Sequence, residues 1–181
     1  SALLDVAAGR GSEMFAVDDR LSGWRVGVGD EPSVPVRLAE PLGEGSGLVA
    51  YDAAGGVVAI YRDPIDGPAR LDIYGDATLR PVLQALDVAD DRTSMAISPG
   101  GTYVAVGGGP DGAVDVIRVS DGSSVGSLDA PRGRTPWRPV HSAAVAIGLD
   151  GVLYVAGLDY SVRRYQLPTL APIEPLESVD T

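Results

Sequence analysis

Short apolar runs separated by turn residues recur along the whole chain. The clearest stretch is 94–128, in which four apolar segments alternate with turns rich in glycine, proline and aspartate. Its segments Met95–Ile97, Tyr103–Val106, Val114–Val119 and Val125–Leu128 have the length of strands and are too short for typical helices. The stretch therefore predicts four consecutive strands, with a hairpin signal at the Asp-Gly pair between the last two.

The same plan returns before and after this stretch. Residues 46–91 and 140–177 repeat it, and residues 13–45 repeat it in part, so 92–139 is one of four approximate units. The remaining predicted strands are Met14–Val17, Trp24–Val28, Val34–Leu38, Leu48–Tyr51, Val57–Tyr61, Leu71–Tyr74, Pro81–Leu86, Ser142–Ile147, Val152–Val155, Ser161–Leu167 and Ala171–Leu176.

The first unit is one strand short in this interpretation. The preceding segment Leu3–Ala8 could begin a helix or form a lone strand, and its part Leu3–Val6 could donate a strand to the incomplete unit.

Turn glycines mark equivalent places in the four units. Gly23, Gly56, Gly101 and Gly151 are separated by 33, 45 and 50 residues, which is the range in which repeats indicate propellers or solenoids. A unit of four strands is expected for a propeller blade. Because one blade cannot bury both of its faces, neighbouring blades must stack on each other.

Two motifs carry a resemblance to a known family. The stretches ISPGGTYVAVGGGPDGAVDVIRVSDGSSVGSL and IGLDGVLYVAGLDYSVRRYQL resemble the WD-repeat β-propeller family. The first matches the family's order of strand, tight turn, strand, Asp-Gly loop and third strand closely. The resemblance covers most of 46–176 and, weakly, 13–40. Where the family places Trp-Asp, this chain has Tyr74-Gly75, Ile117-Arg118 and Tyr165-Gln166, and no Gly-His pair precedes the units.

The resemblance implies an all-β fold, a β-propeller of about four four-stranded antiparallel blades, in which residues 1–181 form a single domain or part of one. Propellers have four to eight blades. The chain could therefore be a small closed ring, a half ring that pairs with itself as a homodimer, or a piece of a larger ring with further blades from another chain. The irregular ends favour the last two.

Composition excludes some chemistry. The chain has no Cys, Lys or Asn, and all 14 basic residues are Arg. The missing Lys and Asn suggest a high-GC, bacterial genome, and without Cys there is no disulfide, thiolate nucleophile or thiolate metal site. The net charge of −11 makes the chain acidic, so we expect no nucleic-acid binding. No apolar run approaches the roughly 18 residues that span a bilayer, so we expect no membrane insertion. The compartment stays open, with the cytoplasm slightly favoured.

The longest predicted connections would lie on one face of a propeller whose strands run outward from the centre. They are 62–70, 87–93, 107–113 and 129–140, and long connections are where binding residues gather. The last one holds a basic and aromatic patch. Its members, the candidate interaction residues, are Arg132, Arg134, Trp137, Arg138 and His141. Arg and Trp are typical of interaction hot spots; alternatively, Trp137 fills a gap between blades and the arginines are solvated.

Catalytic and metal-binding patterns are weak. His141 is the single histidine, with no Ser or Asp partner indicated by spacing. Asp87, Asp90 and Asp91 fit no calcium loop and are interpreted as a solvated linker. We therefore expect no cofactor and no bound metal. The favoured function is a non-catalytic protein-interaction scaffold or sensor within a larger bacterial protein. The alternatives are a propeller enzyme of lactonase, hydrolase or quinoprotein type with a site at the central channel, and a self-assembling half-propeller.

Overall fold

The computed structural model describes residues 2–9, 13–27, 34–109, 112–129, 144–157 and 161–174. Across these ranges it contains sixteen strands and no helix, arranged as four four-stranded antiparallel sheets. No helix in the described ranges could cross a membrane. The predicted all-β class and four-stranded units are confirmed.

Each sheet is a meander in which the strand order follows the sequence. Sheet 1 contains β1 (Leu3–Ala8), β2 (Glu13–Asp18), β3 (Gly23–Gly27) and β4 (Val36–Ala39). Sheet 2 contains β5 (Gly45–Asp52), β6 (Val57–Pro64), β7 (Arg70–Gly75) and β8 (Pro81–Asp87). Sheet 3 contains β9 (Ser94–Ile97), β10 (Tyr103–Gly107), β11 (Ala113–Arg118) and β12 (Ser124–Asp129). Sheet 4 contains β13 (Ala144–Ile147), β14 (Val152–Ala156), β15 (Val162–Gln166) and β16 (Ala171–Ile173).

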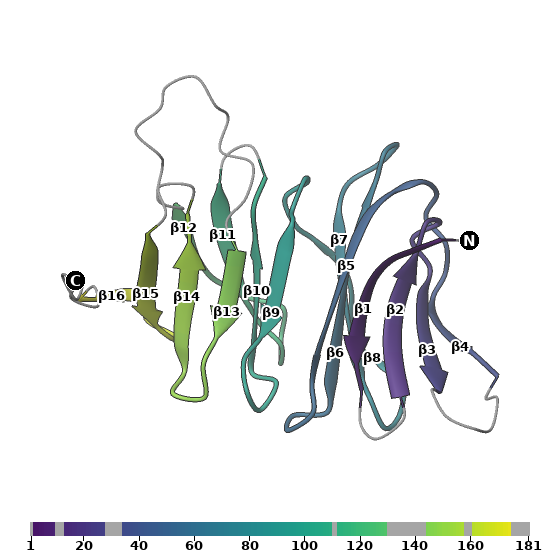
Figure 1. Ribbon diagram of the computed structural model, residues 1–181, viewed down its shortest axis with the longest axis horizontal. Coiled ribbons are helices and arrows are strands. Elements are labelled where there is room, and N and C mark those ends of the chain that lie inside the picture. Colours follow the sequence, from purple (N-terminus) through teal and green to yellow (C-terminus); the bar gives the residue numbers. More distant parts are fainter. Residues whose placement is uncertain are drawn as a thin grey trace, which may run out of the picture.

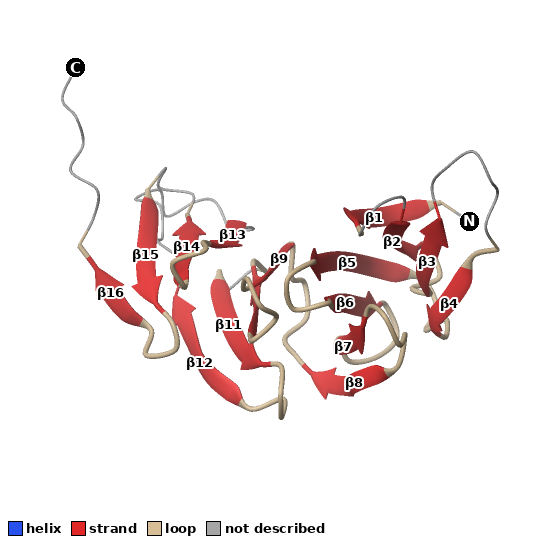
Figure 2. Cartoon of the chain, turned by 90° about the horizontal axis from the view of Figure 1, so that it is seen from below, coloured by secondary structure: helices blue, strands red, loops and turns tan. Residues whose placement is uncertain are grey.

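The four sheets lie side by side as an open arc (Figures 1 and 2). The first strand of each sheet lies on the concave side, where β1 contacts β5, β5 contacts β9 and β9 contacts β13. The last strands β4, β8, β12 and β16 lie on the convex side (Figure 2). The strands therefore run outward from a centre, and the arc is part of a ring and not a closed one.

The segment Leu3–Ala8 completes the first sheet. It forms β1, which pairs with β2 in antiparallel register from Leu3–Asp18 to Ala8–Met14. Sheet 1 thus begins at Leu3, earlier than the predicted start at residue 13, and it has all four strands. The expectation that Leu3–Val6 donates a strand to the incomplete first unit is confirmed, because this segment supplies the inner strand.

Apolar side chains fill the space between each pair of neighbouring sheets. The second strand of each inner sheet is apolar on both sides, so it contributes to two interfaces. In β6, Val58 and Ile60 pack towards sheet 1, whereas Ala59 and Tyr61 pack towards sheet 3, and all four are fully buried. This is why the run VVAIY lacks the alternation of a half-exposed strand.

In sheets 2, 3 and 4, the turns between the third and fourth strands have the same backbone conformation although their sequences differ. Leu79, Gly122 and Leu170 occupy the same place, with φ of 52°, 71° and 55°. Each donates its N–H to the carbonyl four residues earlier, at 2.8–2.9 Å. Only Gly122 adopts this left-handed conformation without a steric penalty, and the two leucines pack against the neighbouring core clusters.

Candidate interaction face

The predicted basic and aromatic patch, Arg132, Arg134, Trp137, Arg138 and His141, lies outside the described residues. It stays a prediction. The face on which it was placed can be followed through the other connections, because those between second and third strands and those between successive sheets all leave the same edge of the arc.

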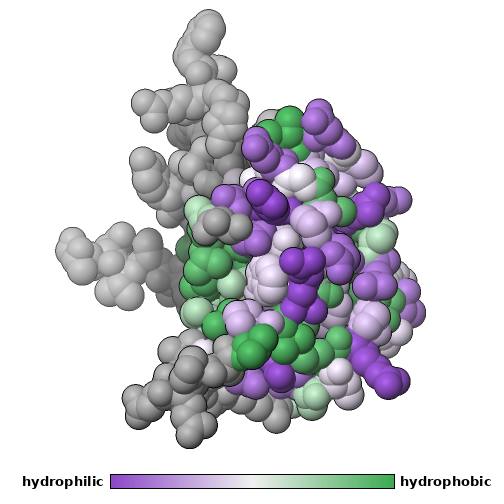
Figure 3. Space-filling model, turned by 90° about the vertical axis from the view of Figure 1, so that its right-hand side faces the viewer, coloured by the Kyte–Doolittle hydropathy of each residue, from purple (hydrophilic) through white to green (hydrophobic). Residues whose placement is uncertain are grey.

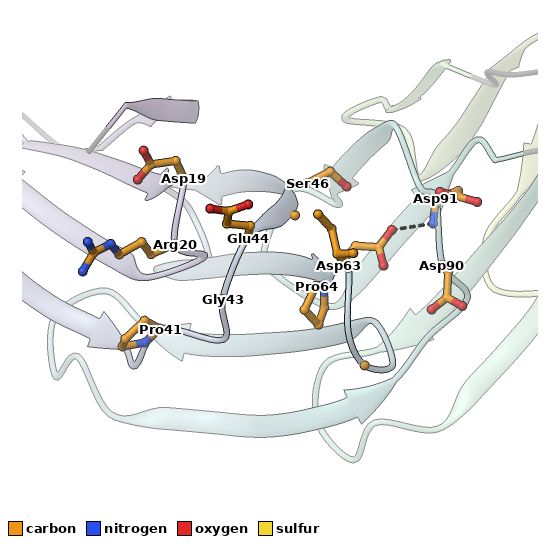
Figure 4. A pocket seen from close by; sticks show the side chains of 13 residues that line it. Asp19, Arg20, Pro41, Gly43, Glu44, Ser46, Asp63, Pro64, Asp90 and Asp91 are labelled. Carbon is orange, nitrogen blue, oxygen red and sulfur yellow. Dashed lines mark hydrogen bonds between the residues drawn. The ribbon is translucent and has the colours of Figure 1, made fainter.

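A hollow of about 1100 Å³ opens on this edge between sheets 1 and 2 (Figure 4). Its walls come from the β2–β3 turn, the β4–β5 connection, the start of β5, the end of β6 with the loop that follows, and the β8–β9 connection. The lining residues are Asp19, Arg20, Pro41, Gly43, Glu44, Gly45, Ser46, Asp63, Pro64, Ile65, Gly67, Asp90 and Asp91.

The hollow is strongly acidic. Five of its lining residues carry a carboxylate and one, Arg20, carries a positive charge. The acidic residues are Asp19, Glu44, Asp63, Asp90 and Asp91. A concave surface lined by one sign of charge concentrates the electrostatic field. The hollow therefore favours positively charged groups.

Some of these carboxylates also fix the loops that form the walls. Asp63 Oδ2 accepts a hydrogen bond from the Asp91 backbone N–H at 2.7 Å (Figure 4). Asp90 Oδ1 accepts one from the Ala69 N–H at 3.0 Å. The β8–β9 connection is thus tied to the end of β6 and to the loop after it.

Backbone hydrogen bonds hold the opposite wall. The N–H groups of Leu42 and Gly43 both donate to the Arg20 carbonyl, at 3.1 and 3.3 Å, and the Ile65 N–H donates to the Glu44 carbonyl at 2.9 Å. At the floor, a Cβ on Gly45 would lie 2.0 Å from the Asp63 carbonyl oxygen. Only glycine allows β5 and β6 to approach this closely.

The rim adds apolar surface to the acidic lining. Pro41 and Pro64 line the hollow, and Ile65 beside them is 74 % exposed. A partner could therefore place both a cationic and an apolar side chain against this site.

Two buried arginines brace this edge of the arc from within. Arg62, at the end of β6, donates to the Asp72 carboxylate and to the carbonyls of Leu21 and Glu40 in sheet 1 and its connection to sheet 2. Arg92, in the β8–β9 connection, is 3% exposed; it donates to Asp115 at 2.8 Å and to the carbonyls of Gly108 and Ala113.

The two acidic partners hold equivalent places. Asp72 pairs with Ile60 across β6 and β7, and Asp115 pairs with Val106 across β10 and β11. The third strand of each inner sheet thus carries the carboxylate of an ion pair, which is buried at Arg62–Asp72 and half-buried on its acidic side at Arg92–Asp115. Its arginines come from different segments, so the repeat is not visible in the sequence.

Metal-binding geometry is not found in the described ranges, where no group of three or more His, Cys, Asp or Glu side chains could hold an ion.

Comparisons with known proteins identify the fold. No protein-family model matches the chain, and no curated protein matches it. Solved structures do. The structure of U3-55K is 17% identical with a TM-score of 0.69 over 95% of this chain and 51% of that one. The WD40 repeats of RRP9 are 16% identical with a TM-score of 0.69 over 95% and 50%. The complex of KlAtg21 with the coiled-coil of AgAtg16 is 13% identical with a TM-score of 0.66 over 97% and 57%.

The chain has the fold of a WD-repeat β-propeller. The predicted WD-like resemblance is confirmed at the level of the fold. The WD-like arc spans about half the length of the solved structures it matches.

Proposed function

We propose that this WD-like arc is a non-catalytic protein-interaction scaffold, and that a partner binds it through the acidic hollow between sheets 1 and 2. The observation that carries the proposal is the hollow itself, with about 1100 Å³ of space and carboxylates contributed by segments from both sheets. WD40-type neighbours support an interaction module in general terms, and one of them is a complex with a coiled-coil.

The chemistry of the hollow selects the kind of partner. Carboxylates on the walls attract Arg or Lys side chains, and the exposed Ile65 beside Pro64 offers a contact for an apolar one. The partner segment is therefore basic with an interspersed apolar residue. Because the walls are fixed by backbone hydrogen bonds, binding requires little ordering of this chain, which favours affinity.

The test measures binding of a fluorescent peptide of alternating arginine and leucine by anisotropy at physiological ionic strength. Glu44→Arg reverses a charge in the hollow, and we expect it to weaken binding about tenfold, which corresponds to about 1.4 kcal/mol. Ile65→Ser removes the apolar contact, and we expect it to weaken binding several-fold.

The matched control is Glu174→Arg. It makes the same charge change at an exposed residue that directly follows β16, the last strand of sheet 4. It should leave the affinity near the wild-type value. Equal losses from Glu44→Arg and Glu174→Arg would show attraction to the overall negative charge and would overturn the hollow as a binding site, as would a peptide that does not bind the wild-type chain.

A further inference from the structure

The two ends of the arc expose sheet faces that resemble the interfaces within it. The N-terminal end face is the outward side of sheet 1, where Val6, Ala8, Met14 and Val26 reach the surface, whereas Ala16 is 1% exposed. Figure 3 views the molecule from this end, where apolar side chains reach the surface between polar ones. The C-terminal end face is the outward side of sheet 4, and it is formed by Tyr154, Ala156, Val162 and Arg164.

The strand register relates the N-terminal end face to the buried face of sheet 2. Val6 pairs with Ala16 in sheet 1, just as Val49 pairs with Ile60 in sheet 2. Val49 and Ile60 belong to the core between sheets 1 and 2. Val49 is 7% exposed, whereas Val6 is 48% exposed. Val6 therefore occupies a position that belongs to an interface between sheets in the case of Val49, but no sheet of this arc covers it.

The second pair on this face agrees. Met14 pairs with Val26, just as Val58 pairs with Tyr74, and Val58 and Tyr74 are buried against sheet 1. The end face therefore keeps apolar side chains at the positions that the inner sheets use for stacking.

The C-terminal end face resembles the opposite face of an inner sheet, namely the face that the following sheet covers. Ala156 pairs with Val162 in sheet 4, just as Gly107 pairs with Val114 in sheet 3. Val114 is fully buried against sheet 4, whereas Val162 is 54% exposed. A further sheet stacked on sheet 4 would cover Val162 as sheet 4 covers Val114.

Polar groups on the N-terminal end face are already satisfied within sheet 1. The Asp18 carboxylate stands where sheet 2 has Arg62, and it accepts hydrogen bonds from Trp24 Nε1 and from the N–H groups of Arg20 and Ser22, at 2.9–3.0 Å. A sheet stacked here would leave no buried carboxylate without partners, so the cost of covering this face is low.

Hydrogen bonds between the first strands of neighbouring sheets are also consistent with stacking of the C-terminal end face on the N-terminal end face. Across two junctions of the arc, a side chain accepts from the next sheet: Asp5 Oδ2 from the Val49 N–H at 2.8 Å, and Ser94 Oγ from the Val145 N–H at 3.0 Å. Ala144 holds the equivalent place in sheet 4 and has no acceptor. The Val6 N–H, which would face it, donates to Asp5 Oδ1 at 2.9 Å and needs none.

We propose that a second copy of this chain closes the ring, with the N-terminal end face of each copy stacked on the C-terminal end face of the other. The arc matches 51%, 50% and 57% of three solved chains with this fold, so a partner of about its own size supplies about the remaining length. A second copy supplies both missing faces at once and generates two identical junctions related by a two-fold axis. The closed assembly has eight sheets.

The first test is the mass of the 181-residue chain by sedimentation equilibrium. We expect twice 18.6 kDa. Val6→Asp places a charge on the N-terminal end face, and Val162→Asp places one on the C-terminal end face. Because each junction contains one face of each kind, either variant puts a charge into both junctions and should be a monomer.

Mixing the two variants tests the head-to-tail geometry. Val162→Asp keeps a native N-terminal end face and Val6→Asp keeps a native C-terminal end face, so the mixture regains one intact junction. We expect a heterodimer that neither variant forms alone. If two N-terminal faces paired instead, Val162→Asp would remain a dimer by itself, and the proposal would be overturned.

The control is Leu149→Asp in the β13–β14 turn, where Leu149 is 94% exposed and lies off both end faces. It should keep the dimer mass. Far-UV circular dichroism and a thermal melt of each variant separate loss of the junction from loss of the fold. A wild-type chain of 18.6 kDa at every concentration, or a mass that grows beyond the dimer as an open polymer, would overturn the proposal.

Discussion

The guanidinium of Arg62 and the carboxylate of Asp72 form an ion pair inside the protein, where their side chains are 7% and 2% exposed. Arg62 also donates to the Leu21 carbonyl at 3.3 Å and to the Glu40 carbonyl at 2.6 Å. One side chain therefore bonds to sheet 2, to the β2–β3 turn of sheet 1 and to the connection between the two sheets.

Removing either partner should be costly because the other would stay buried without its counter-charge. We expect Arg62→Met or Asp72→Leu to lower the free energy of unfolding by about 3–5 kcal/mol. The double variant should lose clearly less than the sum of the two, measured by urea denaturation. Additive losses would contradict a direct coupling between the two groups.

Tyr61 links β6 to the β8–β9 connection. Its hydroxyl donates to the Ala89 carbonyl and accepts from the Arg92 N–H, both at 3.1 Å. Tyr61→Phe removes both bonds, and we expect a loss of about 1–3 kcal/mol at neutral pH, measured by urea denaturation.

The same residue predicts a loss of stability in alkali. Burial raises the pKa of Tyr61 far above its ordinary value, so the folded chain holds the phenolic proton more tightly than the unfolded chain. The stability from this group is complete below about pH 10 and falls as the pH rises towards the folded pKa. Tyr61→Phe should flatten this fall, and an unchanged alkaline profile would contradict the assignment.

Asp18 predicts the opposite dependence in acid. Burial raises its pKa, but hydrogen bonds from the Trp24 indole and from the Ser22 and Arg20 N–H groups outweigh burial, so the pKa lies below its ordinary value. The stability from this carboxylate is complete above about pH 4 and is lost as the pH falls through the folded pKa. We expect Asp18→Asn to cost about 1.5–3 kcal/mol at pH 7. The cost should shrink when the urea titration is repeated at low pH; a cost independent of pH would contradict this role.

Gly55 sits where the β5–β6 turn meets sheet 3. A Cβ at this position would lie 2.4 Å from the Gly100 carbonyl carbon and 2.5 Å from the Gly101 nitrogen, and neither backbone atom can rotate away. We expect Gly55→Ala to cost about 1–3 kcal/mol in a urea titration. Gly67→Ala is the control, because its Cβ would meet only Pro64 at 3.5 Å. Equal effects of the two changes would show that the contact between the turns is not responsible.

Local pattern was enough for most of the fold. Apolar runs such as Val57–Tyr61 and turn signals such as Asp121-Gly122 depend on neighbouring residues only, and they predicted the four-stranded units and the WD-like fold that the structure has. Leu3–Ala8 was the exception, because its strand is defined by pairing with β2 and its sequence is compatible with a helix.

The acidic hollow could not be predicted in the same way. Asp90 and Asp91 were interpreted as a solvated linker, yet they line a wall together with Asp63, Glu44 and Asp19. These residues lie close together only because sheet 1 stacks on sheet 2. Their spacing along the sequence does not predict this proximity.

The sequence by itself determined the repeated unit, the order of its strands and the edge from which the long connections leave. Tertiary structure decided that Arg62 is buried with Asp72, that an acidic hollow opens between sheets 1 and 2, and that Val6 and Val162 lie exposed at the ends of the arc. The physical reason is that strand propensity and turn geometry are local properties, whereas burial depends on which sheet a residue faces.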